Sequence, residues 1–134
     1  PITTCAEENL LGYELDKYHN EDILIHEFAH SMHGLAIVFI DTTFNTTLQK
    51  YLDIAKSEGK WLNTYAGTNI WEYFAEGVQD WFNVNGDAIP GNGTHNWVNT
   101  RKELKEYDTR LYELISKWLP EEYVDISCHV HPDK

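Results

Sequence analysis

The chain has 134 residues, of which 42% are hydrophobic and five are Trp, so it is long enough for one domain with a buried core and is not a disordered chain. Its formal net charge of -12 disfavours nucleic acid and anionic membrane surfaces as partners, because both carry negative charge. No uninterrupted apolar stretch approaches membrane-spanning length, and we predict a single domain over residues 1–134 without a membrane span.

The first long helix is predicted over residues 20–39, where Asn20 can act as the N-cap and two acidic residues follow in the first turn. Its buried side is expected to consist of the apolar residues Ile23, Leu24, Phe28 and Leu35.

Apolar spacing and helix-breaking residues predict three further helices, over residues 41–59, 70–84 and 109–119. Gly59 is the expected stop of the first of these, and Asp108 is the expected N-cap of the last. Two connecting segments are expected, an extended and then looped stretch over residues 60–69 and a glycine-rich surface loop over residues 85–100. The predicted fold class is therefore mainly α, an α+β domain with at most a small sheet.

Two pairs of residues favour a secreted, extracellular protein. Cys5 and Cys128 lie near opposite ends of the chain, and a disulfide between them would stabilise the fold by about 4 kcal/mol in the chain-entropy model. Such a bond requires an oxidising compartment, and two unrelated free thiols are the alternative. Asn45 and Asn92 each begin an Asn-X-Thr glycosylation site, which agrees with a secreted glycoprotein.

The sequence IHEFAH in the first helix carries two histidines four residues apart. His26 and His30 therefore project from the same face of the helix, one turn apart, and can bind one zinc ion, which accepts nitrogen ligands in tetrahedral geometry. Glu27 is rotated by about 100° from His26, so it can lie beside the metal and accept a proton from the attacking water. The simpler alternative is an amphipathic helix that carries three polar residues by chance.

A catalytic zinc site needs a third protein ligand, and the sequence WEYFAEGVQD offers three carboxylates on one face of the third helix. Two registers are open: Glu72 as ligand with Glu76 behind it, or Glu76 as ligand with Asp80 behind it. In either register the second carboxylate would accept a hydrogen bond from the non-ligating nitrogen of a zinc histidine. A solvated acidic stripe is the alternative without a metal.

The segments ILIHEFAH and YLDIAKSEGKWLNTYAGTNIWEYFAEGVQDWF together resemble the catalytic domain of the anthrax lethal factor family of gluzincin metallopeptidases, to which clostridial Pro-Pro endopeptidases are similar. The matching features are a helix ending in SEG, then a Tyr, then TN, and a helix with the pattern E-aromatic-F-A-E. The resemblance covers about residues 20–85 and implies a zincin-like domain. Within this group, the chain is more similar to secreted animal proteins than to the bacterial toxins.

The resemblance implies a role for each matching residue. It assigns His26, His30 and Glu72 as zinc ligands, Glu76 as the carboxylate that supports a zinc histidine, and Tyr65 as a side chain beside the metal. Asp80 is then left as a surface or helix-end residue. A phenol O–H at Tyr65 could stabilise the oxyanion of a tetrahedral intermediate and protonate the leaving amine.

The function predicted from these residues is zinc-dependent endopeptidase, with Glu27 and Tyr65 as catalytic groups and a peptide or protein as substrate. The alternative is a catalytically silent secreted glycoprotein with a binding, storage or toxin-like role on the same scaffold. Related peptidases hold their substrate on an upstream sheet, and only about twenty residues precede the first long helix, so we expect either a truncated substrate cleft or an upstream segment that is absent from this chain. His33 is expected to lie outside the site, where it pairs with a carboxylate or faces solvent. His95 is expected to be a surface residue, and a position in the lining of the cleft is the alternative. The sequence does not predict an oligomeric state.

Overall fold

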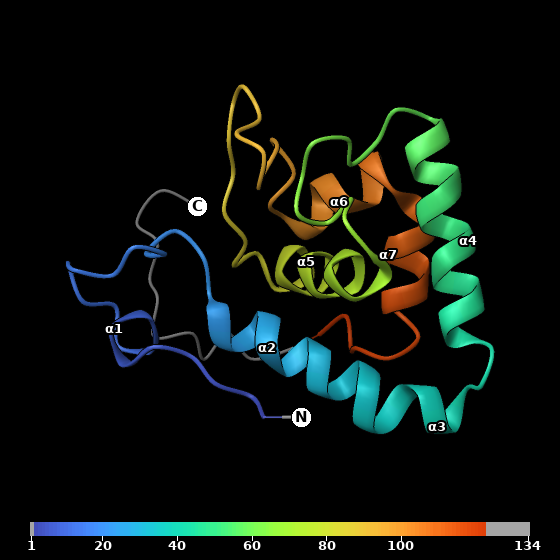
Figure 1. Ribbon diagram of the computed structural model, residues 1–134, viewed down its shortest axis with the longest axis horizontal. Helices are drawn as coiled ribbons and strands as arrows, with labels where there is room; N and C mark the ends of the chain where they lie inside the picture. The colour runs from blue at the N-terminus through green and yellow to red at the C-terminus, as the bar shows by residue number, and fades with distance from the viewer. Residues whose placement is uncertain (1, 123–134) are drawn as a thin grey trace.

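The computed structural model describes residues 2–122, which form helices joined by turns and contain no strand. The mainly α fold class is therefore confirmed for this part of the chain. The elements in chain order are α1 (Glu7–Leu10), α2 (Ile23–Met32), the π-helical turn η1 (His33–Ile37), α3 (Val38–Ile40), α4 (Phe44–Ser57), α5 (Ile70–Phe82), α6 (Arg101–Tyr107) and α7 (Thr109–Ile115). Figure 1 shows α5 at the centre, with α2 beneath it and α4 and α7 beside it.

The predicted first helix is present as α2, η1 and α3, which follow one another without interruption. Its N-cap is Asp22, whose carboxylate accepts a hydrogen bond from the Ile25 N–H at 3.1 Å, so the prediction of Asn20 as N-cap is wrong. Asp22 directly precedes the first helical residue, Ile23. From this position its side-chain oxygen can reach the unpaired N–H groups two or three residues further along the chain.

The buried face of this helix differs from the predicted one. Phe28 and Leu35 are each 55% exposed, so their placement in the core is wrong. The buried side chains come instead from the face that carries the motif histidines, and they are His26, Ala29, His33 and Ile37. Polar rings can be buried there because side chains of neighbouring helices accept their hydrogen bonds.

The helix from Ile23 to Ile40 spans 18 residues and is long and apolar enough, by length and composition, to cross a membrane. One such helix is weak evidence, since a core helix of a soluble protein and a signal sequence pass the same test. The expectation of a chain without a membrane span therefore stays a prediction.

The core is organised around α5, which packs against α2, α4, α6 and α7. Its residues from Tyr73 to Trp81 are all buried. Gly77 allows the close approach of α7, because a Cβ atom there would lie 2.7 Å from Leu111 Cδ2 and 2.9 Å from Ile115 Cδ1. The helix ends at Phe82, and Asn83 closes it in the left-handed conformation with φ 59°.

The helices predicted after the first are present with shorter bounds, and α6 was not predicted. Thr100 caps α6 by accepting from the Glu103 N–H at 3.3 Å, while the Glu103 carboxylate accepts from the Thr100 hydroxyl at 2.8 Å and from the Asn99 N–H at 3.1 Å. This is close to a capping box, and the sequence T-x-x-E carries the signal for it. The stretch over residues 60–69 forms turns and no extended strand.

Asp108, the predicted N-cap of the last helix, is confirmed and also holds the loop that leads to Tyr65. It is fully buried, and its Oδ2 accepts hydrogen bonds from Trp61 Nε1 at 2.8 Å and from the Tyr73 hydroxyl at 2.6 Å. Its Oδ1 accepts from the Leu111 N–H at 3.3 Å. Three donors from different parts of the chain thus meet on one buried carboxylate.

Replacement of Asp108 by Ala is expected to lower the free energy of unfolding by about 3–5 kcal/mol. The substitution leaves Trp61 Nε1 and the Tyr73 hydroxyl buried without an acceptor. Urea denaturation followed by tryptophan fluorescence measures the change. Glu113→Ala, at an exposed position of α7, is the control and is expected to change stability by less than about 0.5 kcal/mol. Equal stabilities of the two variants would contradict this role of Asp108.

Candidate functional site

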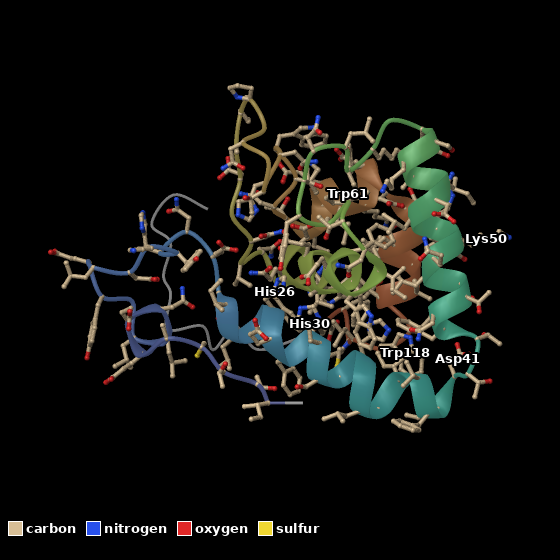
Figure 2. The ribbon with its side chains drawn as sticks, viewed as in Figure 1. His26, His30, Asp41, Lys50, Trp61 and Trp118 are labelled. Atoms are coloured by element: carbon tan, nitrogen blue, oxygen red, sulfur yellow. The ribbon has the colours of Figure 1, made fainter. Side chains whose placement is uncertain are left out.

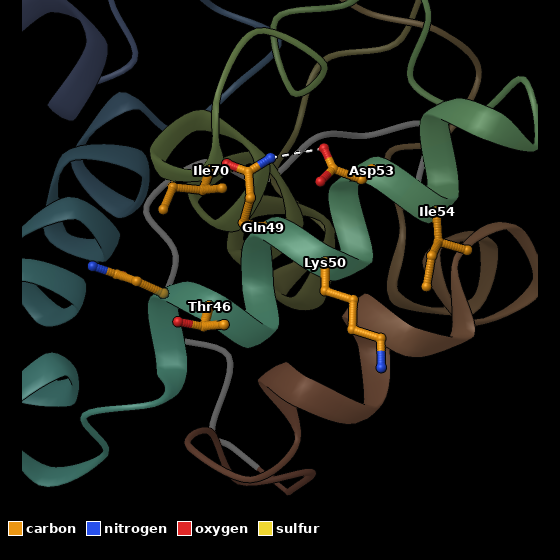
Figure 3. Close-up of a pocket in the computed structure, with 7 residues that line it drawn as sticks. Thr46, Gln49, Lys50, Asp53, Ile54 and Ile70 are labelled. Carbon is orange, nitrogen blue, oxygen red and sulfur yellow. Dashed lines mark hydrogen bonds between the residues drawn. The ribbon is translucent and has the colours of Figure 1, made fainter.

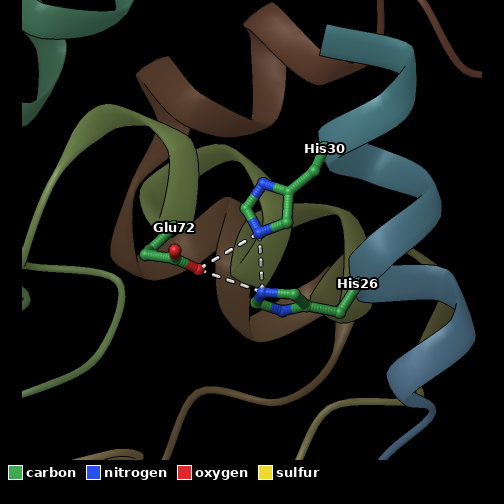
Figure 4. A group of neighbouring side chains, drawn as sticks. All are labelled: His26, His30 and Glu72. Atoms are coloured by element: carbon green, nitrogen blue, oxygen red, sulfur yellow. Dashed lines mark hydrogen bonds and ion pairs between the residues drawn. The ribbon is translucent and has the colours of Figure 1, made fainter. Parts of the chain in front are cut away.

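Three side chains from α2 and α5 converge on one point. His26 Nε2 lies 3.1 Å from His30 Nε2 and 3.0 Å from Glu72 Oε2, and His30 Nε2 lies 3.3 Å from the same glutamate oxygen. Figure 4 shows these three atoms facing one another between the two helices. In Figure 2, His26 and His30 lie on the side of α2 that faces α5.

The local sequence explains why these side chains meet. The spacing of four residues stacks His26 and His30 on one face of α2, and this face packs on α5. Glu72 lies in the first turn of α5, where the Asn69 side chain caps the helix by accepting from the Trp71 and Glu72 N–H groups. The positive end of the helix dipole stabilises a carboxylate at this position.

The second nitrogen of His26 is held by α5. His26 Nδ1 donates a hydrogen bond to Gln79 Oε1 at 2.7 Å, and it also lies 3.4 Å from Glu76 Oε1. Gln79 Nε2 donates to the Asp22 carbonyl at 3.1 Å, which turns the amide oxygen toward the histidine. With its proton on Nδ1, the neutral ring presents a lone pair on Nε2 toward His30 and Glu72.

Gln79 was missed from the sequence, although it lies seven residues after Glu72 and therefore on the same face of α5. A pattern restricted to carboxylates overlooks it, because an amide is a weak signal in a sequence. The structure places Glu76 beside His26 as expected, but the nearest acceptor for His26 Nδ1 is the amide oxygen of Gln79.

Asp80 lies in the last turn of α5, in agreement with a helix-end position, but it is fully buried, so its placement on the surface is wrong. It accepts a hydrogen bond from Asn85 Nδ2 at 2.8 Å, and the same amide donates to Glu76 Oε2 at 3.2 Å. Burial raises the pKa of Asp80 well above its ordinary value. Asp80 is buried because α5 packs against α2, α4, α6 and α7, and the sequence of α5 alone does not indicate this packing.

His26 and Glu72 form an ion pair in which Nε2 and Oε2 are 3.0 Å apart. Burial of His26 opposes its protonation, but hydrogen bonds with Glu72, Glu76 and Gln79 outweigh this and raise its pKa to about 10. Burial of Glu72 likewise opposes ionisation, and hydrogen bonds from His26 and His30 outweigh it and lower the pKa of Glu72 to about 2. A proton on His26 thus supplies the positive charge next to the Glu72 carboxylate that a bound cation would supply in its place.

Glu27 and Tyr65 border a cleft next to this cluster. The cleft has a volume of about 420 Å³, and it is lined by Tyr18, Glu21, Ile23, His26, Glu27, Tyr65, Glu76 and Thr94. The Tyr65 ring stacks beside that of His26 with centroids 6.1 Å apart, and Tyr65 is 42% exposed. Partial burial, and then the charge of Glu72, raise the pKa of the Tyr65 phenol, which keeps it protonated.

Of the other two histidines singled out in the sequence, His33 is buried and His95 is half-buried. His33 is fully buried in an aromatic cage, stacks on Trp71 with centroids 4.0 Å apart, and donates from Nε2 to Asn45 Oδ1 at 2.6 Å. It takes no part in the cluster. The His95 side chain is only 11% exposed, so its description as a surface residue is wrong. Much of the glycine-rich loop is exposed, as predicted, but the His95 side chain near its end lies between Glu21 and Glu76.

The features that predicted secretion lie apart from the cluster. Asn45 and Asn92 are both exposed. Cys5 is half-buried, and Cys128 lies outside the described residues, so the disulfide stays a prediction.

A second hollow, of about 620 Å³, runs along α4 (Figure 3). Its lining consists of Asn45, Thr46, Gln49, Lys50, Asp53, Ile54 and Ile70. Gln49 Nε2 donates to Asp53 Oδ1 at 2.8 Å, so the polar side chains there are partly satisfied by each other. None of the three predicted metal ligands lines it.

The donor set of the cluster matches the requirements of zinc. With Zn–N and Zn–O distances near 2.05 Å and tetrahedral angles, neighbouring ligand atoms should lie about 3.3 Å apart. The three ligand atoms here are separated by 3.0, 3.1 and 3.3 Å. Among the described residues this is the one group of at least three His, Cys, Asp or Glu side chains found close enough to hold a metal ion. Two imidazoles and a carboxylate leave the fourth position for water.

Comparisons with protein-family models, with curated proteins and with solved structures gave no match.

Proposed function

We propose that the protein is a zinc-dependent endopeptidase that hydrolyses peptide or protein substrates. The observation that carries this proposal is the triangle formed by His26, His30 and Glu72, whose edges of 3.0, 3.1 and 3.3 Å are close to the separation of about 3.3 Å in a tetrahedral zinc site. These three residues would hold the ion. When bound, zinc supplies a Lewis acid that polarises a carbonyl and lowers the pKa of water toward 7.

The side chains around the cleft supply the remaining chemistry. Glu27 lines the cleft beside His26, where its carboxylate can take the proton of the attacking water and pass it to the leaving amine. The Tyr65 phenol lines the same cleft and keeps its proton, so it can donate a hydrogen bond to the oxyanion as charge develops. Gln79 and Glu76 keep the His26 ring in the tautomer and orientation that ligation requires.

A structural zinc site is a poorer explanation of the same residues. Structural sites are closed by four protein ligands and favour cysteine. This cluster has three ligands, and one of them, His26, lines a cleft together with the Glu27 carboxylate and the Tyr65 phenol. The remaining alternative is a catalytically silent secreted glycoprotein on the same scaffold. Two exposed glycosylation sites agree with secretion in either case, and we propose an extracellular location.

The experiment that tests the proposal combines metal analysis with hydrolysis of a mixed peptide library. We expect one zinc per chain at neutral pH, cleavage of the library, loss of cleavage after treatment with a chelator, and recovery on addition of zinc. Absence of stoichiometric zinc would refute the metal site. Stoichiometric zinc without chelator-sensitive cleavage would favour the silent scaffold. The cleaved bonds would also identify the preferred sequence.

Zinc binding is expected to release about one proton per chain from His26 at pH 7.5, because its pKa in the metal-free protein is about 10 and the ligand must be neutral. Zinc affinity should accordingly rise with pH up to about 10. Calorimetric titrations in buffers of different ionisation enthalpy measure the protons released; a value of zero would mean that His26 is already neutral.

Protonation of His26 also stabilises the protein without zinc. This contribution is complete below the ordinary histidine pKa of 6.5 and is lost as the pH rises through 10.

A further inference from the structure

His95 comes from a loop far from the motif residues, yet it lies between two elements that border the cleft. The loop folds back on itself through hydrogen bonds from the Ala88 N–H to the Asn96 carbonyl at 2.7 Å and from the Asn92 N–H to the His95 carbonyl at 3.2 Å. The Asn92 side chain accepts from the Thr94 and His95 N–H groups at 2.9 and 2.8 Å. The loop therefore has a defined shape that carries the His95 side chain inward.

The His95 ring connects a carboxylate that precedes α2 with a carboxylate of α5. Its Nε2 lies 3.5 Å from Glu21 Oε1, and its Nδ1 lies 3.7 Å from Glu76 Oε2. All three side chains are largely buried: His95 is 11% exposed, Glu21 is 12% exposed and Glu76 is 5% exposed. The ring also lies against the backbone of Gly86, where a Cβ atom would be 3.1 Å from His95 Nε2. We call His95, Glu21 and Glu76 the His95 bridge.

The His95 bridge is connected to both halves of the proposed site. Glu76 reaches His95 with Oε2 and His26 with Oε1, the latter at 3.4 Å from His26 Nδ1. On the other side, the carbonyl of Thr94, the residue before His95, accepts a hydrogen bond from the Tyr65 N–H at 2.8 Å. A displacement of His95 would therefore move the backbone that anchors Tyr65 and would leave Glu76 Oε2 with the Asn85 amide as its remaining partner.

We propose that His95 is a positioning residue, which bridges Glu21 and Glu76 and thereby holds Tyr65 in its reactive position beside the zinc ligands without touching the substrate. This inference rests on the proposed peptidase function. The neighbours Glu21, Glu76 and Thr94 line the cleft, whereas His95 does not. Contact with Glu21, and then with Glu76, raises the pKa of His95 to about 10, which favours a charged ring between the two carboxylates. The contact with Glu76 is an ion pair at 3.7 Å and not a hydrogen bond.

The test compares His95→Ala with His95→Gln, whose amide retains donors for the carboxylates, and with His19→Ala as the control at an exposed histidine. At saturating zinc, His95→Ala is expected to lower kcat by about 10–100-fold with KM changed by less than about 3-fold. His95→Gln should recover a large part of kcat, and His19→Ala should equal wild type. Thermal denaturation checks that each variant is folded, and if His95→Ala is not, His95→Gln is compared with wild type in its place.

A double-mutant cycle with Tyr65→Phe separates positioning from a general loss of structure. If His95 acts through Tyr65, then His95→Ala should lower kcat by less than about 3-fold in the Tyr65→Phe background, because the position of the missing hydroxyl no longer matters. Equal fold losses in both backgrounds, or a His95→Ala protein with wild-type kcat, would overturn the inference about His95 alone. Absence of chelator-sensitive hydrolysis by wild type would overturn the proposed function, and the role of His95 with it.

Discussion

Replacement of Glu27 by Gln is expected to lower kcat for peptide hydrolysis by about 10²–10⁴-fold while zinc remains bound at one ion per chain. The amide has nearly the same shape as the carboxylate but cannot accept the proton of the attacking water. Glu27 borders the cleft and is not one of the three converging ligands, so the substitution leaves the His26, His30 and Glu72 triangle intact. Steady-state kinetics on the best library peptide, with zinc analysis of the same sample, measures both quantities.

Glu27→Asp provides the matched comparison, because it keeps the charge and shortens the side chain by one methylene group. We expect its activity to lie between those of wild type and Glu27→Gln, since proton transfer depends steeply on the distance to the water. If wild type and Glu27→Gln cleave the library at the same rate, any observed cleavage does not come from this site, and the peptidase proposal fails.

Replacement of Glu72 by Gln is expected to weaken zinc binding by more than about 100-fold, because loss of a direct ligand should exceed the 10–100-fold effect typical of residues that only support a ligand. The carboxylate provides both an oxygen ligand and a negative charge, and its oxygen lies 3.0 and 3.3 Å from the two histidine nitrogens. Competition with a fluorescent chelator gives the dissociation constant. Peptide hydrolysis at limiting zinc should fall in parallel.

Two other glutamates serve as comparisons for Glu72→Gln. Glu76→Gln should weaken zinc binding by about 10–100-fold, since Glu76 contacts His26 through the ring nitrogen opposite the ligand position. Glu113→Gln, at an exposed site on α7, should have no effect. An equal or larger effect at position 76 would mean that the second register, with Glu76 as ligand, describes the site.

Glu72→Gln and Glu76→Gln also each remove a carboxylate that contacts His26. The carboxylate of Glu72 has a pKa of about 2, so it stabilises the fold above its ordinary value of 4.5, and this contribution is lost as the pH falls through 2. Stability of each variant should therefore be measured with zinc and without it. A loss of binding caused by unfolding would then be visible in the sample without zinc.

The sequence predicted the helices that carry the cluster because their signals are local. The spacing of His26 and His30 follows from the helical repeat, and Asp108 and Gly59 mark helix boundaries through their own backbone and side-chain chemistry. The three residues of the metal cluster were all named from the sequence, and the structure brings their ligand atoms together. Their binding of zinc is a proposal that the experiments above test.

The tertiary structure decided which side of each helix is buried. Phe28 and Leu35 are apolar and exposed, whereas His26 and His33 are polar and buried, because α5 and α4 offer acceptors at Gln79 and Asn45 for the rings that face them. A hydrophobic pattern along one helix contains no information about acceptors on another. The same reason explains why Asp80 was placed at the surface, since its partner Asn85 lies beyond the end of the helix.

The residues that hold the site in place depend still more on contacts between distant segments. Gln79 accepts a hydrogen bond from His26, which is 53 residues away in the sequence. His95 contacts Glu76 and Glu21, which are 19 or more residues away. The sequence by itself therefore determined the helices and the motif residues, whose geometry follows from the backbone repeat. Only the packing of α2 on α5, and the return of the loop that carries His95, decided which polar groups surround them, because hydrogen bonds between distant side chains require a fold that brings donor and acceptor together.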